Sequence, residues 1–179
     1  MKTPITIRQE SPQDHTTIYK LIRAAFASVE DSDHSEQDLV ERLRHSSSFI
    51  PELSLVAETG RGELVGHILL TRIRIINDAQ TFPSLAVAPL SVLPSCQRQG
   101  IGNALIREAH RRAAALGYDS AVLLGHPGYY PRFGYLPAHR FGIRFPIDAP
   151  VDCCMVIELQ PDGLKGVQGR VEYDPAFGI

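Results

Sequence analysis

Apolar and polar residues alternate in parts of this chain with the period of two that marks a half-buried strand. Ile5 and Ile7 alternate with Thr6 and Arg8 and predict a first strand. Longer apolar runs predict further strands over residues 53–58, 63–76, 81–93, 120–125 and 151–160. Because the Gly60-Arg61-Gly62 turn separates the second strand from the third, we expect a hairpin there.

Three other segments show the spacing of an amphipathic helix. The first follows Ser11-Pro12-Gln13-Asp14, which supplies an N-cap, a proline at the first helical position and an acidic third residue. The predicted buried faces are Ile18, Leu21, Ile22, Ala25 and Phe26 in the first helix, Leu39, Val40 and Leu43 in a second helix that begins near Ser35, and Ile101, Leu105, Ala109, Ala113 and Leu116 in a third that Gly117 closes. The order βααββ, β-loop-α, βα, β predicts a mixed α/β fold.

Composition narrows the class of protein. With 179 residues and 44% hydrophobic content, one domain over residues 1–179 can bury its own core. A net charge of −2 argues against a nucleic-acid partner, and without a long apolar run or a leader we expect a soluble, unprocessed protein with no membrane partner. The three cysteines have neither disulfide nor metal-ligand spacing, which indicates a cytoplasmic protein without a metal.

The segment from Val92 to Leu105 joins an apolar strand to a helix through a glycine-flanked turn. Gly100 and Gly102 have no Cβ to keep a ligand away, and the first N–H groups of the helix have no partner within it. The helix dipole adds partial positive charge at the same place, so we expect the turn to hold a phosphate group, with a simple tight turn as the alternative.

Two other nucleotide-binding motifs fit this turn poorly. A dinucleotide fingerprint needs a small residue where Leu105 stands. A P-loop needs a lysine next to its last glycine, and no lysine occurs between Lys20 and Lys165.

The run Gln97-Arg98-Gln99-Gly100-Ile101-Gly102 resembles the acetyl-CoA loop of the GCN5-related N-acetyltransferases, the GNAT family. A second run, from Gly125-His126-Pro127-Gly128 to Tyr135, resembles the aromatic motif that follows the fifth strand of that family, in wording similar to its YhbS-like branch. The resemblance covers roughly residues 5 to 160. His126 and Pro127 depart from the commoner pattern, which has an asparagine and an open helix start there.

The resemblance implies the GNAT acyl-CoA N-acyltransferase fold, α+β in character, with a mostly antiparallel twisted sheet, a splayed strand pair and helices on both faces. It implies an acetyltransferase in which an amine attacks acetyl-CoA directly in a ternary complex. The cofactor-binding residues carried over are Leu90, Val92, Gln97, Arg98, Gln99, Gly100, Ile101, Gly102, Asn103 and Arg132. Leu90 would offer its N–H to the acetyl carbonyl, and Val92 would pair with the pantetheine amides. Arg132 would reach a phosphate, or is a solvated arginine.

Pro89 points to the same region without reference to the family. A proline cannot donate to a β-ladder, so we expect a bulge or interruption around Ala88-Pro89-Leu90, unless Pro89 only ends a short edge strand.

Tyr130 is the predicted general acid for the departing thiolate, because the family's tyrosine at this position lies near the sulfur, whereas Tyr129 is interpreted as packing. Glu30, His67 and His126 are all able to act as the base; His126 at a strand end is favoured, and His67 is interpreted as a core histidine. Cys96 lacks an activating neighbour and is interpreted as structural.

The acceptor is the least defined part of the hypothesis. Residues 29–34 form an acidic loop that would attract a cationic amine, or would only favour the start of the next helix. A small amine, a peptide N-terminus and a protein lysine all remain open, and a homodimer is compatible with the sequence. The alternative function is a non-catalytic CoA-binding sensor or interaction module on the same fold.

Overall fold

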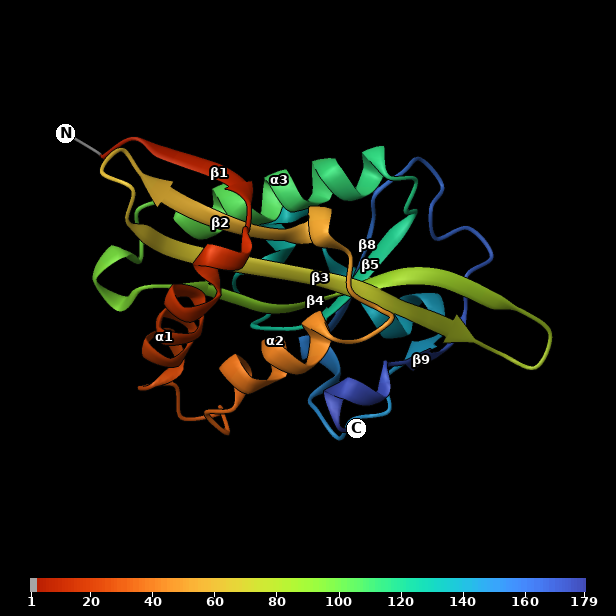
Figure 1. Cartoon of the computed structure of the whole chain (residues 1–179). Coiled ribbons are helices and arrows are strands. Elements are labelled where there is room, and N and C mark those ends of the chain that lie inside the picture. Colours follow the sequence, from red (N-terminus) through yellow and green to blue (C-terminus); the bar gives the residue numbers. More distant parts are fainter. Residues whose placement is uncertain (1–2) are drawn as a thin grey trace.

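The computed structural model describes residues 3–179, which form a twisted sheet with helices on both faces (Figure 1). The helices are α1 (His15–Phe26), α2 (Glu36–Arg44) and α3 (Ile101–Ala115). The strands are β1 (Ile5–Gln9), β2 (Ser54–Thr59), β3 (Leu64–Ile76), β4 (Thr81–Val92), β5 (Ser120–Leu124), β6 (Leu136–Pro137), β7 (Ile143–Arg144), β8 (Cys154–Glu158) and β9 (Gly169–Glu172). Their order is β1-β2-β3-β4-β5-β8-β6, with β9 paired to β3 and β7.

The two faces of the sheet bury different helices. The apolar stripe of α3, which includes Leu105 and Ala109, packs against Ile68 and Leu70 of β3. On the opposite face, α1 and α2 pack against Leu69. Most strand pairs of the described residues are antiparallel, and among them only β4–β5 and β7–β9 are parallel. Alternate residues of β3 therefore lie in separate hydrophobic cores on the two faces of the sheet. The strand directions confirm the predicted mixed, mostly antiparallel fold.

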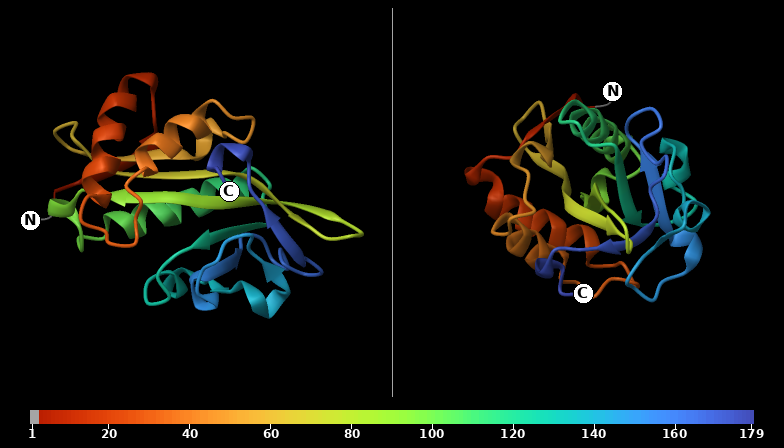
Figure 2. Two further views of the ribbon diagram at one scale, coloured as in Figure 1. Left: turned by 90° about the horizontal axis from the view of Figure 1, so that it is seen from below. Right: turned by 90° about the vertical axis from the view of Figure 1, so that its right-hand side faces the viewer.

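The second half of β4 has no partner on the side of β5. The two strands pair only at Leu85–Ala121 and Ala86–Val122, after which they diverge, as the left view of Figure 2 shows. On its other side β4 pairs with β3, and the register shifts where Ile68–Leu70 face Val87–Leu90. Pro89 lies within this shift, so the predicted interruption is confirmed. Because β4 is locally an edge at this point, the missing N–H of Pro89 costs no ladder bond to β5.

Most of the predicted elements are confirmed with shifts of one or two residues at their ends. The Gly60–Gly62 turn joins β2 to β3, and Gly117 follows α3 with a φ of +91°. Ser11 begins a capping box with Asp14, although the first turn is a 3-10 helix. The last predicted strand is shorter than expected, because residues 151–153 form a 3-10 turn before β8.

Three features differ from the sequence prediction. Leu116 is 46% exposed instead of buried, because α3 ends at Ala115 before the apolar face completes another turn. The segment after β5 forms only a 3-10 turn over Tyr130–Phe133, where the prediction had a helix. The short strands β6, β7 and β9 were missed, since two to four residues are too few to show a period.

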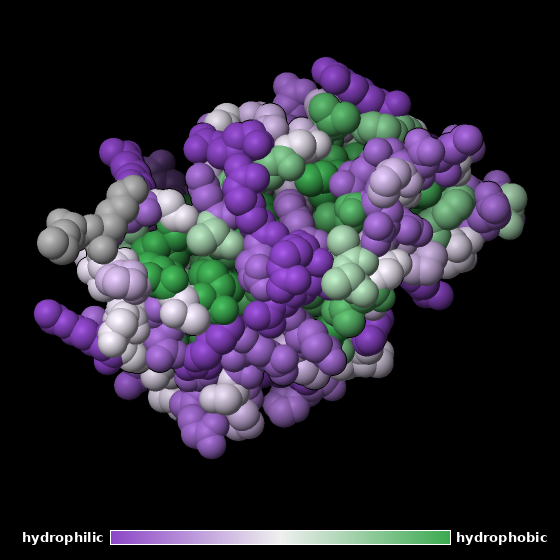
Figure 3. Space-filling model, turned by 90° about the horizontal axis from the view of Figure 1, so that it is seen from above, coloured by the Kyte–Doolittle hydropathy of each residue, from purple (hydrophilic) through white to green (hydrophobic). Residues whose placement is uncertain are grey.

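Figure 3 views the face of the molecule that carries α3. Hydrophilic side chains cover much of it, and apolar surface shows between them near the N-terminal end of the chain. There β1, the β2–β3 turn and the start of α3 enclose a cavity of about 880 Å³, with Ile5, Val65 and Ala104 in its walls.

Candidate active site

The start of α3 presents unpaired backbone N–H groups. Gly100, the residue before the helix, has a φ of +85°, which is the left-handed region that favours glycine. The first helical hydrogen bond runs from the Ala104 N–H to the Gly100 carbonyl, at 3.0 Å. Within the described chain, the N–H groups of Ile101, Gly102 and Asn103 donate to no backbone carbonyl. This turn therefore offers donors and partial positive charge to an anion.

A cavity of about 640 Å³ opens from this turn toward the unpaired edge of β4. Nine of the predicted cofactor-binding residues line it: Leu90, Val92, Gln97, Arg98, Gly100, Ile101, Gly102, Asn103 and Arg132. Cys96, Tyr129 and the predicted acid Tyr130 complete the lining. Gln99 instead lines the neighbouring 880 Å³ cavity, and its amide donates to the Ser95 carbonyl at 3.4 Å.

Tyr129 lines the cavity and makes a polar contact there, whereas the sequence suggests only packing. Its hydroxyl donates to Asn103 Oδ1 at 2.8 Å, across the start of α3. A Cβ on Gly102 would lie 3.0 Å from that hydroxyl, so glycine leaves room for the tyrosine. The Arg132 guanidinium lies over the Tyr129 ring, 4.6 Å from its centroid. No sequence signal separated Tyr129 from its neighbour, because two adjacent tyrosines fit either role.

Tyr130 is held in place by glycine and by aromatic rings. A Cβ on Gly125 would lie 2.3 Å from the Tyr130 ring, so only glycine fits beneath it. The ring meets Tyr129 and Tyr135 edge to face, with centroids at 4.9 and 5.8 Å. The Tyr135 hydroxyl in turn is 2.8 Å from His110 Nε2. Burial raises the pKa of Tyr130 to about 12, so the phenol keeps its proton near neutral pH.

His126 lies outside the cavity. It is exposed at the end of β5, and its Nδ1 accepts a hydrogen bond from the Gly128 N–H at 3.1 Å. Its Nε2 makes no hydrogen bond to the described residues. The structure therefore brings Tyr130, but not His126, together with the predicted cofactor-binding residues.

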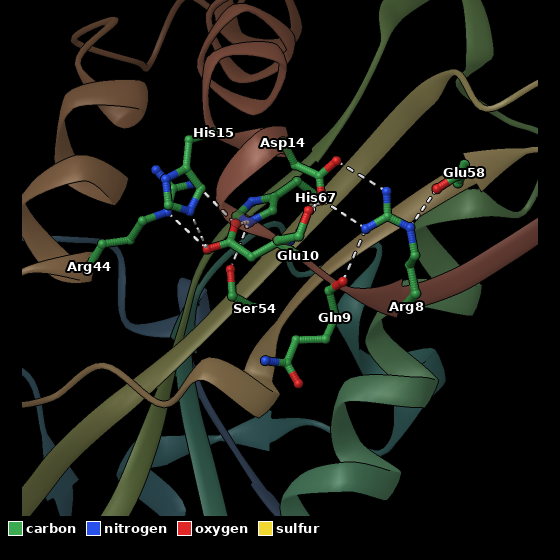
Figure 4. Close-up of polar contacts among 10 residues, drawn as sticks. Arg8, Gln9, Glu10, Asp14, His15, Arg44, Ser54, Glu58 and His67 are labelled. Carbon is green, nitrogen blue, oxygen red and sulfur yellow. Dashed lines mark hydrogen bonds and ion pairs between the residues drawn. The ribbon is translucent and has the colours of Figure 1, made fainter.

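His67 is fully buried, as predicted for a core histidine, and belongs to a charged network (Figure 4). Its Nε2 is 3.1 Å from Ser54 Oγ and 3.5 Å from Glu10 Oε2. Glu10 also accepts two hydrogen bonds from Arg44, at 2.8 and 3.0 Å, and lies 3.6 Å from His15. His67 Nδ1 has no hydrogen-bond partner in the described chain. The network ties the end of β1 to α2 and β3.

Burial and charge oppose each other in this network. Burial alone would raise the pKa of Glu10, but the hydrogen bonds from His67 and Arg44 outweigh it and hold that pKa well below its usual range. Burial lowers the pKa of His67, and the neighbouring Glu10 carboxylate only partly opposes this. Near neutral pH the network thus contains an ionised Glu10 carboxylate and a neutral His67.

The acidic loop is partly committed to the start of α2. Asp33 Oδ1 accepts hydrogen bonds from the Ser35 N–H at 3.0 Å and from the Ser35 hydroxyl at 2.6 Å, which lowers the pKa of Asp33. Glu30 and Asp31 are exposed. Asp33 therefore supports the start of α2, whereas Glu30 and Asp31 are free to attract a cationic amine. Both interpretations of the acidic loop keep support.

Residues 3–179 hold no group of three or more His, Cys, Asp or Glu side chains arranged to bind a metal ion. In the same range, no helix is both long and apolar enough to cross a membrane.

Comparison with known proteins gives the family. The acetyltransferase (GNAT) domain model matches residues 6–138. The chain is 31% identical to the N-acetyltransferase YhbS of Escherichia coli K12 over 171 residues, which cover 96% of this chain and 97% of YhbS. It is 34% identical over 137 residues to the N-acetyltransferase YjhQ of the same organism, covering 73% and 75% of the two chains.

Two solved structures share the whole fold. The crystal structure of Escherichia coli YhbS in complex with CoA matches with a TM-score of 0.89 at 28% identity, covering 100% of this chain and 94% of that one. A GNAT family acetyltransferase from Brucella melitensis in complex with acetyl-CoA matches with a TM-score of 0.79 at 34% identity, covering 98% and 99%. Both loop motifs, the splayed sheet and these relatives agree: the chain belongs to the GNAT family of acetyltransferases.

Proposed function

We propose that this protein transfers the acetyl group of acetyl-CoA to an amine by direct attack within a ternary complex. The observation that carries the proposal is the single cavity that joins the unpaired edge of β4 to the free N–H groups at the start of α3. Acetyl-CoA has a thioester, an amide-bearing arm and a pyrophosphate in that order, and the cavity offers a complementary surface to each. The CoA and acetyl-CoA complexes of the relatives support the choice of ligand.

The residues of the cavity fit this co-substrate. The N–H groups of Ile101, Gly102 and Asn103 are unpaired donors for the pyrophosphate, and a Cβ on Gly100 would meet no protein atom within 4 Å, so its space is open to a ligand. The free edge of β4 around Leu90 and Val92 can pair with an extended chain that carries amides. Acetyl-CoA supplies the activated acetyl thioester.

Two groups of the chain would then serve the chemistry. The Leu90 N–H would stabilise the negative charge that develops on the acetyl oxygen. The Tyr130 hydroxyl, which makes no hydrogen bond to a described residue, would donate its proton toward the departing thiolate. A raised pKa suits this role, since a phenol that stays protonated near neutral pH is a donor. His126, an exposed residue whose Nε2 makes no hydrogen bond to the described residues, remains our proposed base.

The acceptor is an amine, and residues 1–179 act as one domain. Cys96, Cys153 and Cys154 are free thiols, which supports a reducing compartment and so the cytoplasm.

The test is to mix the protein with acetyl-CoA and a panel of amines and to follow thiol release. The proposal predicts turnover with at least one amine and a rate that depends on both substrates. Binding of acetyl-CoA without turnover on any amine, and without any effect of Tyr130→Phe, would instead favour a binding module. His126→Gln is measured in the same assay, and an unchanged pH–rate profile would remove His126 as the base.

A further inference from the structure

The face of the sheet opposite α3 carries Leu124, Leu136 and Cys154, and the turn just before β8 carries Val151; we call these four residues the apolar wall. Leu124 of β5 pairs with Cys154 of β8, and Leu136 of β6 pairs with Val156 of β8. Directly paired residues point to the same face of a sheet. Val156 is buried in the core opposite α3, so Leu136 also points to that face. The turn that holds Val151 packs beside β6.

The wall is open to solvent. Leu124 is 39% exposed, Leu136 43% and Val151 58%, and they are among the few large apolar residues on the surface. The cause is the divergence of β4 from β5 beyond Ala86 and Val122, which leaves the end of β5 without a neighbouring strand on the side of β4 (Figure 2, left). Solvent exposure of several adjacent apolar side chains costs free energy, and a bound apolar group would remove that cost.

The wall adjoins the proposed reaction centre. Leu124 directly precedes Gly125, the residue whose missing Cβ makes room for the Tyr130 ring. The Gly125 N–H donates to the Cys153 carbonyl at 2.9 Å, which fixes the start of β8 beside the same point. The cofactor cavity is lined from the α3 face, whereas the wall occupies the other face of the diverging strands. An amine that reaches the thioester from that face would pass over the wall.

We propose that the acceptor is an amine that carries an apolar group, an alkyl chain or an aromatic ring, and that this group lies on the apolar wall. The inference rests on the proposed acetyl transfer and adds its substrate class. From β5 to β6 the wall spans two strand spacings, roughly 10 Å at about 4.8 Å per strand. A chain of that length is long enough to distinguish a hydrophobic amine from a short one.

The first experiment measures kcat/KM with acetyl-CoA for a series of linear amines from ethylamine to octylamine. The expected result is a rise of up to about fourfold per methylene, the fold-change that corresponds to about 0.8 kcal/mol, until the chain outgrows the wall. Leu136→Ser and Val151→Ser should flatten this dependence, so that octylamine loses far more of its kcat/KM than ethylamine does. Leu116→Ser is the matched control, because Leu116 is a leucine of similar exposure, 46%, at the far end of α3.

A second measurement does not need turnover. With methyl-labelled leucine and valine, titration of octylamine into the protein saturated with CoA should shift the methyl resonances of Leu124, Leu136 and Val151 and leave that of Leu116 in place. If no amine is acetylated yet these shifts occur, the proposed reaction fails and the apolar site stands. No dependence of kcat/KM on chain length in an active enzyme, or equal shifts at Leu116, overturns the inference. So does a dimer in sedimentation that Leu136→Ser converts to monomer, since the wall would then be covered by a second copy.

Discussion

Replacing Gly100 by alanine is the sharpest test of the phosphate-binding turn, because the chain offers a matched control at the other end of the same helix. Gly100 and Gly117 flank α3, with φ of +85° and +91°. A Cβ at either position would have no atom within 4 Å. Both substitutions therefore force alanine into the left-handed region without a clash, and each should lower the free energy of unfolding by about 1–2 kcal/mol.

Only Gly100→Ala should affect the ligand. Its new methyl group would sit in open space on the turn that carries the free N–H groups of Ile101 and Gly102, which is the proposed place of the pyrophosphate. A hydrogen bond to a charged partner contributes about 1.5–3 kcal/mol, so the loss of one such bond should weaken acetyl-CoA binding roughly 10- to 150-fold. Gly117→Ala should leave the dissociation constant unchanged.

Isothermal titration calorimetry with acetyl-CoA measures the binding, and chemical denaturation measures the stability of both variants. Equal affinities for Gly100→Ala and Gly117→Ala, at equal loss of stability, would refute the assignment of the pyrophosphate to this turn. A larger loss of stability in Gly100→Ala than in Gly117→Ala would show that the methyl group disturbs the turn even without a ligand.

Four further predictions concern the acid, the buried network, its pH dependence and the acidic loop. Tyr130→Phe should lower kcat by about 10² or more and leave acetyl-CoA affinity nearly unchanged, as steady-state kinetics and calorimetry would show; a wild-type kcat would return Tyr130 to packing. Glu10→Gln should cost about 3–5 kcal/mol because it removes the buried carboxylate that pairs with the Arg44 guanidinium and leaves that guanidinium with the exposed Glu41. Glu41→Gln removes the exposed carboxylate instead and should cost no more than ~1 kcal/mol, so equal losses in urea denaturation would contradict this. Folding lowers the pKa of both His67 and Glu10, so the unfolded chain takes up protons at pH values where the folded chain does not. Stability should therefore be greatest above the ordinary histidine pKa of about 6.5, and it should fall below that pH and again below about 4.3. Melting temperatures that are flat from pH 7 to 4 would disprove it. Neutralising the three acids of residues 29–34 together should raise KM for a cationic amine at low salt and less at high salt, and an unchanged KM in both would remove the loop from the acceptor site.

Local sequence patterns predicted the elements whose energetics are local. The period of α3, the glycines at its two ends and the apolar runs of β3 and β4 are each decided by neighbours along the chain, and the structure confirms them. Pro89 even located the interruption in β4, because the loss of a backbone donor is a property of the residue itself.

Contacts between distant segments left no such signal. Glu10 pairs with Arg44, more than thirty positions away along the chain, and with His67, more than fifty positions away. No local pattern in the sequence relates these three polar residues. The polar contact of Tyr129 leaves no local sequence signal, because its partner Asn103 lies on another element. Exposure of the wall could not be read from the sequence either, since Leu124 continues the apolar run of β5 and becomes accessible only because β4 has turned away.

The free half of β4 also constrains the shape of what this protein can bind. An edge strand normally invites pairing with any other chain, which is why proteins protect such edges. Here the edge faces β5 across the gap that opens where the two strands diverge (Figure 2, left). A single extended chain with hydrogen-bonding groups along its length can pair with such an edge. We therefore expect β4 to favour a narrow, extended ligand over a flat or branched one.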